Sequence, residues 1–293
     1  MSGFGPVITA MATPFDECNQ LNMDSLRKLV IHLGRHGSSA ILVTGTTGEA
    51  PVLSATEKLR VWETAVDFSE PGVSIIAGVG TNNTRTTLHS IKVAEEAGVQ
   101  GLLIVTPYYN CPSQEGLLEH FRQAAQSTDL PILLYNIPSR TGVNLEYDTL
   151  SRLMEEKNIV GIKDAGGDVK RISKLKEIAQ PGFSIYTGDD KMFLDTLKAG
   201  GDGVVSVASH VVGQQMARIY QNFQEGKLKE AEELDKALAP VYNLLGNTMN
   251  PAPIKGLLRQ MGIAVGGLRL PLVPMEAEEA ALLYHTLSHL LDS

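Results

Sequence analysis

The sequence is poor in the features that mark secreted, membrane-bound and nucleic-acid-binding proteins. It has two cysteines in 293 residues, Cys18 and Cys111, which excludes a scaffold held by several disulfides and favours a reducing compartment. No apolar run approaches the roughly 18 residues of a membrane-spanning helix, and no basic segment followed by a long apolar one opens the chain. We therefore expect a cytoplasmic protein with no membrane partner.

Basic clusters and metal-ligand clusters are also missing. The chain has 25 Lys and Arg against 33 Asp and Glu, a formal net charge of -8, without a basic cluster that would bind nucleic acid. Two histidine pairs, His32 with His36 and His285 with His289, have the spacing of one helix face. Neither has a nearby third ligand or the glutamate of an H-E-x-x-H motif, so we expect no metal site.

Short apolar runs, by contrast, are abundant. Eight of them read as strands, and most are separated by stretches with apolar residues at helical spacing and a glycine just after the last turn. Strands that are apolar throughout indicate a parallel sheet covered by helices. The predicted strands are Val7–Ala12, Ala40–Thr44, Ser74–Gly78, Gly101–Thr106, Ile132–Asn136, Val160–Lys163, Ser184–Thr187 and Val204–Ala208.

A weak internal repeat favours closure of this sheet. Segments 36–43, 97–105 and 200–207 each show a glycine, then a small residue, then a strand, as at a joint between helix and strand. Eight such units predict an α/β fold, a (β/α)8 TIM barrel over residues 1–225, with a C-terminal helical extension over 226–293 packed on it. An open doubly wound sheet is the alternative, but no G-x-G-x-x-G turn follows the first strand.

In such a barrel the chemistry lies where the strands end. The second strand runs into TGTTGEAP (44–51), where backbone N–H groups between glycines can hold a small anion such as a carboxylate. A plain turn before a helix is the alternative, with Ser54 and Glu57 as the capping box of that helix. Segment 199–209, AGGDGVVSVAS, could imitate a barrel phosphate site, but the joint between helix and strand also explains its glycines and is the favoured interpretation.

Three tyrosines and an arginine stand at other strand ends. Tyr135 ends the fifth strand, and Tyr108 and Tyr109 follow the fourth. Because neighbouring residues point in opposite directions, only one of the latter two can face the barrel mouth of its own chain. Arg140 lies in the loop PSRTG, where it either holds a carboxylate through two hydrogen bonds or forms a surface ion pair.

Lys163 follows the apolar run Ile159–Ile162 at the end of the sixth strand. It is either a solvated strand end or a nucleophile. Because an amine attacks a carbonyl carbon only when neutral, a lysine kept poorly solvated by this apolar wall suits imine formation with an α-keto acid. The next residue, Asp164, is expected to be structural.

Together these motifs resemble the pyruvate-dependent lyase and synthase superfamily of (β/α)8 barrels. Within it, the segment TPYYN and the arginine of PSRTG are similar to the dihydrodipicolinate synthase family. The resemblance implies a lyase that condenses pyruvate with L-aspartate-4-semialdehyde to 4-hydroxy-tetrahydrodipicolinate in lysine biosynthesis, without a metal or organic cofactor. The matching segments cover essentially the whole chain in order: GTTGEAP, TPYYNCPSQEGLLEHF, LLYNIPSRTG, GIKDAGG, TGDD, GGDGVVSV and NPAPIK.

The resemblance also implies residue roles. Lys163 matches the lysine that forms a Schiff base with pyruvate, and Tyr135, Thr46 and Tyr109 match a proton relay. In the family, Tyr109 comes from a neighbouring subunit of a homotetramer built from tight dimers.

The remaining implied roles concern substrate binding. Thr47 matches the contact to the pyruvate carboxylate, Arg140 the contact to the carboxylate of the semialdehyde, and Gly188 and Val205 residues that line the site. A sialic acid or keto-deoxy-sugar lyase is a second enzymatic interpretation, and a non-catalytic barrel that binds a keto acid is a third.

Two features depart from the family pattern. Many relatives inhibited by lysine have His, His and Glu in the cleft that binds it, where this chain has Ala55, Lys58 and Thr86. Losing an acid and gaining Lys58 disfavours a cationic amino acid, so we expect weak or no inhibition by L-lysine. Cys111 stands where relatives often have a basic residue, and we expect a tolerated free thiol.

Overall fold

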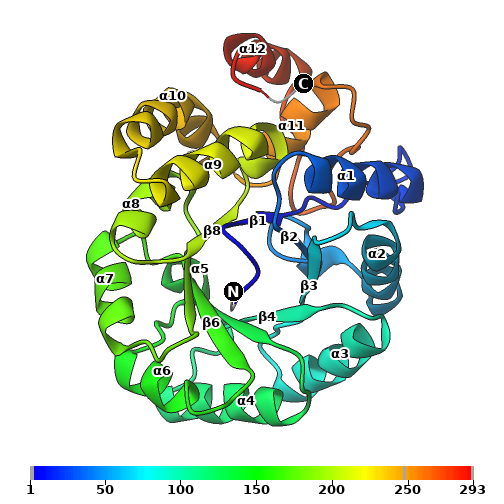
Figure 1. Cartoon of the computed structure of the whole chain (residues 1–293). Coiled ribbons are helices and arrows are strands. Elements are labelled where there is room, and N and C mark those ends of the chain that lie inside the picture. The colour runs from blue at the N-terminus through cyan, green and yellow to red at the C-terminus, as the bar shows by residue number, and fades with distance from the viewer. Residues whose placement is uncertain (1–2, 247–248, 292–293) are drawn as a thin grey trace.

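The computed structural model describes residues 3–246 and 249–291 and contains a closed barrel of eight parallel strands (Figure 1). Each strand pairs with the next in sequence, and the eighth returns to the first, where Val7 pairs with Val204 and Ile8 with Val205. The strands are β1 Val7–Ala10, β2 Ala40–Val43, β3 Ser74–Gly78, β4 Gly101–Val105, β5 Ile132–Asn136, β6 Ile159–Asp164, β7 Ser184–Thr187 and β8 Gly203–Ser206.

The predicted (β/α)8 barrel is thus confirmed, and the strand ends differ from those predicted by one or two residues at most. The joints behave as expected, because Gly37, Gly98 and Gly200 have φ angles of 91°, 81° and 87°, in the left-handed region that favours glycine. Sequence reasoning identified these joints correctly because their signal is local.

Helices form a ring around the barrel (Figure 1). Side chains of Asn22, Asn83 and Ser113 each accept a hydrogen bond from the backbone N–H three residues later, and Ser54 with Glu57 forms the predicted capping box. The helices of the ring are α1 Met23–Arg35, α2 Ala55–Phe68, α3 Thr84–Glu96, α4 Gln114–Gln126, α6 Tyr147–Leu153, α7 Val169–Ile178, α8 Phe193–Lys198 and α9 Ser209–Gln224. The short helix α5 Pro138–Thr141 directly follows β5 inside the ring, and η1 Ala50–Val52 and η2 Asp190–Met192 are short 3-10 turns.

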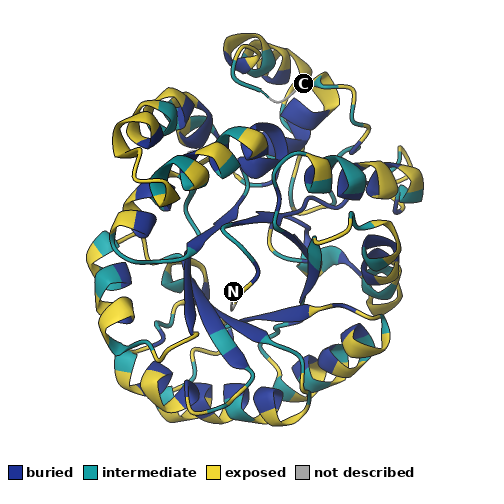
Figure 2. Cartoon of the chain, in the orientation of Figure 1, coloured by how far each residue is buried: buried dark blue, intermediate teal, exposed yellow. Residues whose placement is uncertain are grey.

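The buried apolar residues form two clusters (Figure 2). The larger lies between the strands and the helices. The smaller fills the barrel interior and consists of Phe4, Ile8, Ala10, Ala40, Leu42, Ile76, Leu103, Leu133, Tyr135, Tyr186 and Val205. Phe4 lies against Gly101 at the start of β4. The N-terminal segment therefore fills the end of the barrel where the strands begin, opposite their carboxyl ends.

The C-terminal extension consists of α10 Leu228–Gly246, α11 Ala252–Gln260 and α12 Ala277–Leu287. Helix α10 packs on α9, and α11 packs on both α9 and α12 (Figure 1). The helical extension predicted over 226–293 is thus present, and its last two residues lie outside those described. We keep residue 226 as the proposed start of the extension. No helix in the described part of the chain is long and apolar enough to cross a membrane.

Candidate active site

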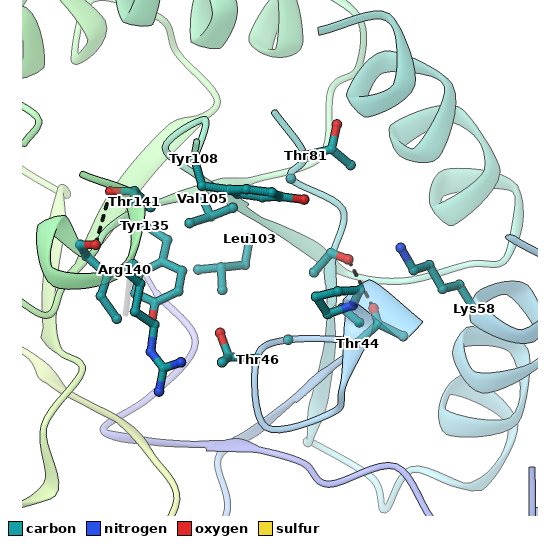
Figure 3. A pocket seen from close by; sticks show the side chains of 16 residues that line it. Thr44, Thr46, Lys58, Thr81, Leu103, Val105, Tyr108, Tyr135, Arg140 and Thr141 are labelled. Atoms are coloured by element: carbon teal, nitrogen blue, oxygen red, sulfur yellow. Dashed lines mark hydrogen bonds between the residues drawn. The ribbon is translucent and has the colours of Figure 1, made fainter. Parts of the chain in front are cut away.

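A cavity of about 260 Å³ opens where β2 to β5 end (Figure 3). Three predicted site residues line it, and the hydroxyls of Thr46 and Tyr135 and the guanidinium of Arg140 point toward the same space in Figure 3. The structure therefore unites residues from the ends of two strands, β2 and β5. The full lining is Thr44, Gly45, Thr46, Ala50, Pro51, Lys58, Gly78, Gly80, Thr81, Leu103, Val105, Tyr108, Tyr135, Ile137, Arg140 and Thr141.

The charges in this lining are of one sign. Lys58 and Arg140 are cationic, and no carboxylate lines the cavity. Lys58 is half-buried on α2, and burial lowers the pKa of its ammonium group. A cavity with two cations and several hydroxyls suits a small carboxylic acid better than a cationic ligand.

Lys163 is buried beside this cavity and is not a solvated strand end. Its side chain is 6% exposed, it pairs with Tyr135 across β5 and β6, and its Nζ lies 4.2 Å from the centroid of the Tyr135 ring. Two lysines are buried in the described part of the chain. Lys255 forms an ion pair with Glu49, whereas no carboxylate pairs with Lys163 among the described residues.

The apolar surroundings of Lys163 differ from those predicted. Ile159 and Ile162 were expected to desolvate the amine, but both belong to the cluster between strands and helices. Ile162 lies there because neighbouring side chains alternate along a strand, and Ile159 precedes the irregularity at which the pairing of β5 with β6 shifts register. The interior cluster with Tyr135 and Tyr186 lies on the lysine side instead. A Cβ atom at Gly188 would lie 2.9 Å from Lys163 Cε, so this glycine leaves room for the lysine.

The other predicted residues lie around this centre. Thr47 is buried and its hydroxyl accepts a hydrogen bond from Asn250 Nδ2 at 2.9 Å. Val205 is buried in the barrel interior on β8. Tyr108 lines the cavity, whereas Tyr109 is 91% exposed, which confirms that only one of the two faces the mouth of its own barrel.

Comparisons with known proteins cover nearly the whole chain. The model of the "Dihydrodipicolinate synthetase family" matches residues 3–290. A curated relative from Halalkalibacterium halodurans, named 4-hydroxy-tetrahydrodipicolinate synthase 1, is 46% identical over 275 residues, covering 94% of this chain and 93% of the relative. The chain belongs to the dihydrodipicolinate synthetase family. The family and the lyase class indicated by the motifs are thereby confirmed.

Two solved structures of relatives bear on ligands. A DHDPS from Cyanidioschyzon merolae with lysine bound is 37% identical, with a TM-score of 0.95, and the match covers 98% of this chain and 99% of that one. A chloride-inhibited dihydrodipicolinate synthase from Acinetobacter baumannii, complexed with pyruvate, is also 37% identical, with a TM-score of 0.93 and 98% of each chain covered.

The backbone N–H groups just after β8, which could have bound a phosphate, instead bind a side chain of the same protein. Asp190 is half-buried, and its Oδ2 accepts hydrogen bonds from the backbone N–H groups of Val207, at 3.2 Å, and Ala208, at 2.9 Å. Burial raises the pKa of Asp190. Because these amides already have a partner, the structure favours the joint between helix and strand as the explanation of this segment.

Metal ligands are likewise not assembled in the described ranges, since no three His, Cys, Asp or Glu side chains gather there in a way that could hold an ion. His32 and His36 stack on each other with ring centroids 4.1 Å apart. Cys18 and Cys111 are free and exposed.

Asp164 joins the ends of β5 and β6 behind the site. Its Oδ2 accepts hydrogen bonds from Arg171 Nε at 2.7 Å and Asn136 Nδ2 at 2.9 Å, and its Oδ1 accepts one from Gly166 N at 3.0 Å. Asn136 and Asp164 directly follow Tyr135 and Lys163 in their strands. The hydrogen bond from Asn136 joins the ends of β5 and β6, and the buried ion pair with Arg171 links the end of β6 to α7 (Val169–Ile178).

Replacing Asp164 with alanine leaves the Arg171 guanidinium buried without its partner. We expect the free energy of unfolding to fall by about 3–5 kcal/mol, the usual cost of breaking a buried ion pair. Urea unfolding followed by circular dichroism measures this change.

The matched control is Glu177→Ala, which breaks the exposed Lys174–Glu177 pair on α7. It should cost less than about 1 kcal/mol, because solvent screens exposed pairs. Equal losses for the two variants would contradict the structural role of Asp164.

Proposed function

We propose that this enzyme condenses pyruvate with L-aspartate-4-semialdehyde to give 4-hydroxy-tetrahydrodipicolinate, through a Schiff base on Lys163. The observation that carries the proposal is a buried lysine without a carboxylate partner, lying against the ring of Tyr135 beside a cationic cavity. The pyruvate complex of the Acinetobacter baumannii relative and the name of the Halalkalibacterium halodurans relative support the same substrate and product.

In the first step, the neutral amine of Lys163 attacks the keto carbon of pyruvate. The carbinolamine then loses its hydroxyl as water and becomes an imine that links Nζ to the substrate carbon. Tyr135, whose hydroxyl points toward Thr46 in Figure 3, supplies the proton to the departing hydroxyl and afterwards takes one from the methyl carbon. The result is an enamine on Lys163.

In the second step, the methyl-derived carbon of the enamine attacks the aldehyde carbon of the semialdehyde. The aldehyde oxygen takes up a proton and becomes a hydroxyl, and the imine to Lys163 is restored. The amino group of the substrate then attacks the imine carbon and closes the ring. Lys163 leaves as the free amine, so the product carries the substrate nitrogen and the enzyme is regenerated.

Two carboxylates need partners during these steps. Thr47 and the backbone N–H groups of the turn that holds it are assigned to the pyruvate carboxylate. Arg140, which points into the cavity, is assigned to the carboxylate of the semialdehyde. Gly188 and Val205 border the space around Lys163 and complete the proposed site.

The Schiff base predicts a covalent adduct. Borohydride reduction in the presence of pyruvate, followed by peptide mass mapping, should add reduced pyruvate to Lys163. Lys163→Arg should lose the adduct and nearly all activity, because a guanidinium stays protonated. Lys174→Arg serves as the control, since Lys174 lies in an exposed ion pair on α7, and it should keep the adduct.

An enzyme without this adduct on Lys163 would contradict the mechanism. Turnover measured with the semialdehyde and with N-acetylneuraminate separates the proposed reaction from that of a sialic acid lyase. Turnover of neither, with an adduct still present, would favour the non-catalytic keto-acid binder.

Tyr109 is proposed to complete the site of a neighbouring subunit in a homotetramer of two dimers. The support is its exposure of 91% and its left-handed backbone, with φ of 74°, which directs it away from its own cavity. Co-expression of Tyr109→Ala chains with Lys163→Arg chains tests this arrangement. Each variant alone should lose about 10²–10⁴-fold in activity, as expected for a proton-transfer or nucleophilic group.

Mixed oligomers should regain activity, because one of the two hybrid sites then has an intact lysine and an intact tyrosine from its neighbour. If Tyr109 acted within its own chain, both hybrid sites would be defective and the mixture would stay inactive. Sedimentation velocity on the same samples measures the oligomeric state.

L-Lysine is proposed to inhibit this enzyme weakly or not at all. Lys58 lines the cavity together with Arg140, no carboxylate lies in that lining, and Ala55 and Thr86 are exposed on α2 and α3. A second ammonium group would therefore meet like charge. Calorimetry should detect no binding of L-lysine at sub-millimolar concentration, whereas the Cyanidioschyzon merolae relative serves as the positive control.

Half-maximal inhibition by sub-millimolar L-lysine in the coupled assay would contradict this expectation. A Thr86→Glu variant extends the test, because the acid that it restores should raise the affinity for L-lysine if charge is the determinant.

A further inference from the structure

The turn that contains Thr46 and Thr47 lies between two residues with left-handed backbones. Thr44 has a φ of 53° and Glu49 a φ of 56°. Such angles are uncommon for residues other than glycine and are an outlier for a β-branched residue such as threonine. Strained conformations of this kind persist only where the surroundings hold them.

Thr44 is held by local partners. Trp62 on α2 donates a hydrogen bond from Nε1 to Thr44 Oγ1 at 2.8 Å, and Thr44 Oγ1 donates to the carbonyl of Gly78 at 3.0 Å. The end of β1 supports the turn as well, because the hydroxyl of Thr13 donates to the carbonyl of Gly48 at 2.7 Å. These contacts lie within the barrel.

Glu49 is held by the C-terminal extension instead. Its Oε1 pairs with Lys255 Nζ on α11 at 2.6 Å, and its Oε2 accepts a hydrogen bond from the backbone N–H of Arg269 at 2.9 Å. The Glu49 and Lys255 side chains are both 0% exposed. Lys255 Nζ and Arg269 Cζ each lie 4.3 Å from the centroid of the Phe15 ring, so the ring makes a cation–π contact with both cations.

A second link joins the same extension to the same turn. Asn250, just before α11, donates from Nδ2 to Thr47 Oγ1 at 2.9 Å. Two separate side chains of the extension therefore converge on a turn of a few residues. An ion pair that served only to fasten the extension could lie anywhere on the barrel surface. The Glu49–Lys255 pair instead lies next to Thr47, which is proposed to bind the pyruvate carboxylate.

We propose that Glu49 and Lys255 are positioning residues, which together with Asn250 hold the Thr46–Thr47 turn in the geometry that receives the pyruvate carboxylate. The C-terminal extension thereby completes the pyruvate site without contacting the reacting atoms. This inference rests on the proposed function, since it assigns the pyruvate carboxylate to Thr47.

The test separates positioning from stability. Glu49→Gln and Lys255→Met each leave a buried group unpaired, so both should lower stability and weaken pyruvate binding. The double variant Glu49→Gln/Lys255→Met has no unpaired buried charge, and its amide can still accept from Arg269 N. Its unfolding midpoint should therefore return toward that of the wild type.

The readout is the pyruvate concentration that gives half-maximal borohydride trapping on Lys163. It should rise about tenfold or more in the double variant, because a displaced binding group costs affinity even in a folded protein. The KM for the semialdehyde should change much less. Asn250→Ala, which leaves the ion pair intact, should raise the same pyruvate concentration by a smaller factor.

The matched control is Glu57→Gln. It removes the Arg269–Glu57 ion pair, which also fastens the extension to α2, but leaves Glu49 and Lys255 together. It should lower the unfolding midpoint without changing pyruvate trapping. An equal rise in this control would show that any loosening of the extension has the same effect and would overturn the specific role of the pair.

Wild-type trapping by the double variant and by Asn250→Ala would also overturn the proposal. If the double variant does not fold, Asn250→Ala decides alone. A wild-type enzyme that forms no pyruvate adduct refutes the proposed function instead, so the two failures are distinguishable.

Discussion

Closure of the sheet, where β8 pairs with β1, is the constraint on which the rest of the molecule depends. Because all strands are parallel, closure brings every carboxyl end to one rim, and Thr46, Tyr135 and Lys163 meet there although they are far apart in sequence. The opposite end is filled by Phe4, which leaves this rim as the place where a ligand can reach the barrel interior.

Lys163 and Lys255 are both buried, but their neighbours differ, and their proposed roles differ accordingly. Lys255 forms an ion pair with Glu49, whose backbone is left-handed. Lys163 lies against an aromatic ring and has no carboxylate partner in the described structure, which is the basis for proposing it as the nucleophile. The difference is set by what the neighbouring strands and the extension bring to each side chain, not by burial itself.

Local signals made most of the fold predictable. Apolar runs located all eight strands, left-handed glycines marked the joints, and the Ser54–Glu57 spacing identified a helix start, because each depends on residues close in sequence. Features that depend on distant partners were missed. The pairing of Glu49 with Lys255 spans 206 residues, and the hydrogen bonds of Asp190 to Val207 and Ala208 join two different strand ends. The face on which Ile162 lies was also misjudged, because only pairing with neighbouring strands shows which side of β6 faces inward.

The C-terminal extension has a consequence for the order in which the chain folds during synthesis. All eight strands are complete once Ser206 has been made, yet Lys255 and Arg269 follow later. Until they arrive, the carboxylate of Glu49 has neither its cation nor its backbone donor, and only the barrel's own contacts to Thr44 and Gly48 hold the turn. An early segment of the chain therefore gains part of its support only from residues made near the end of synthesis, and the proposed pyruvate site is not complete before then.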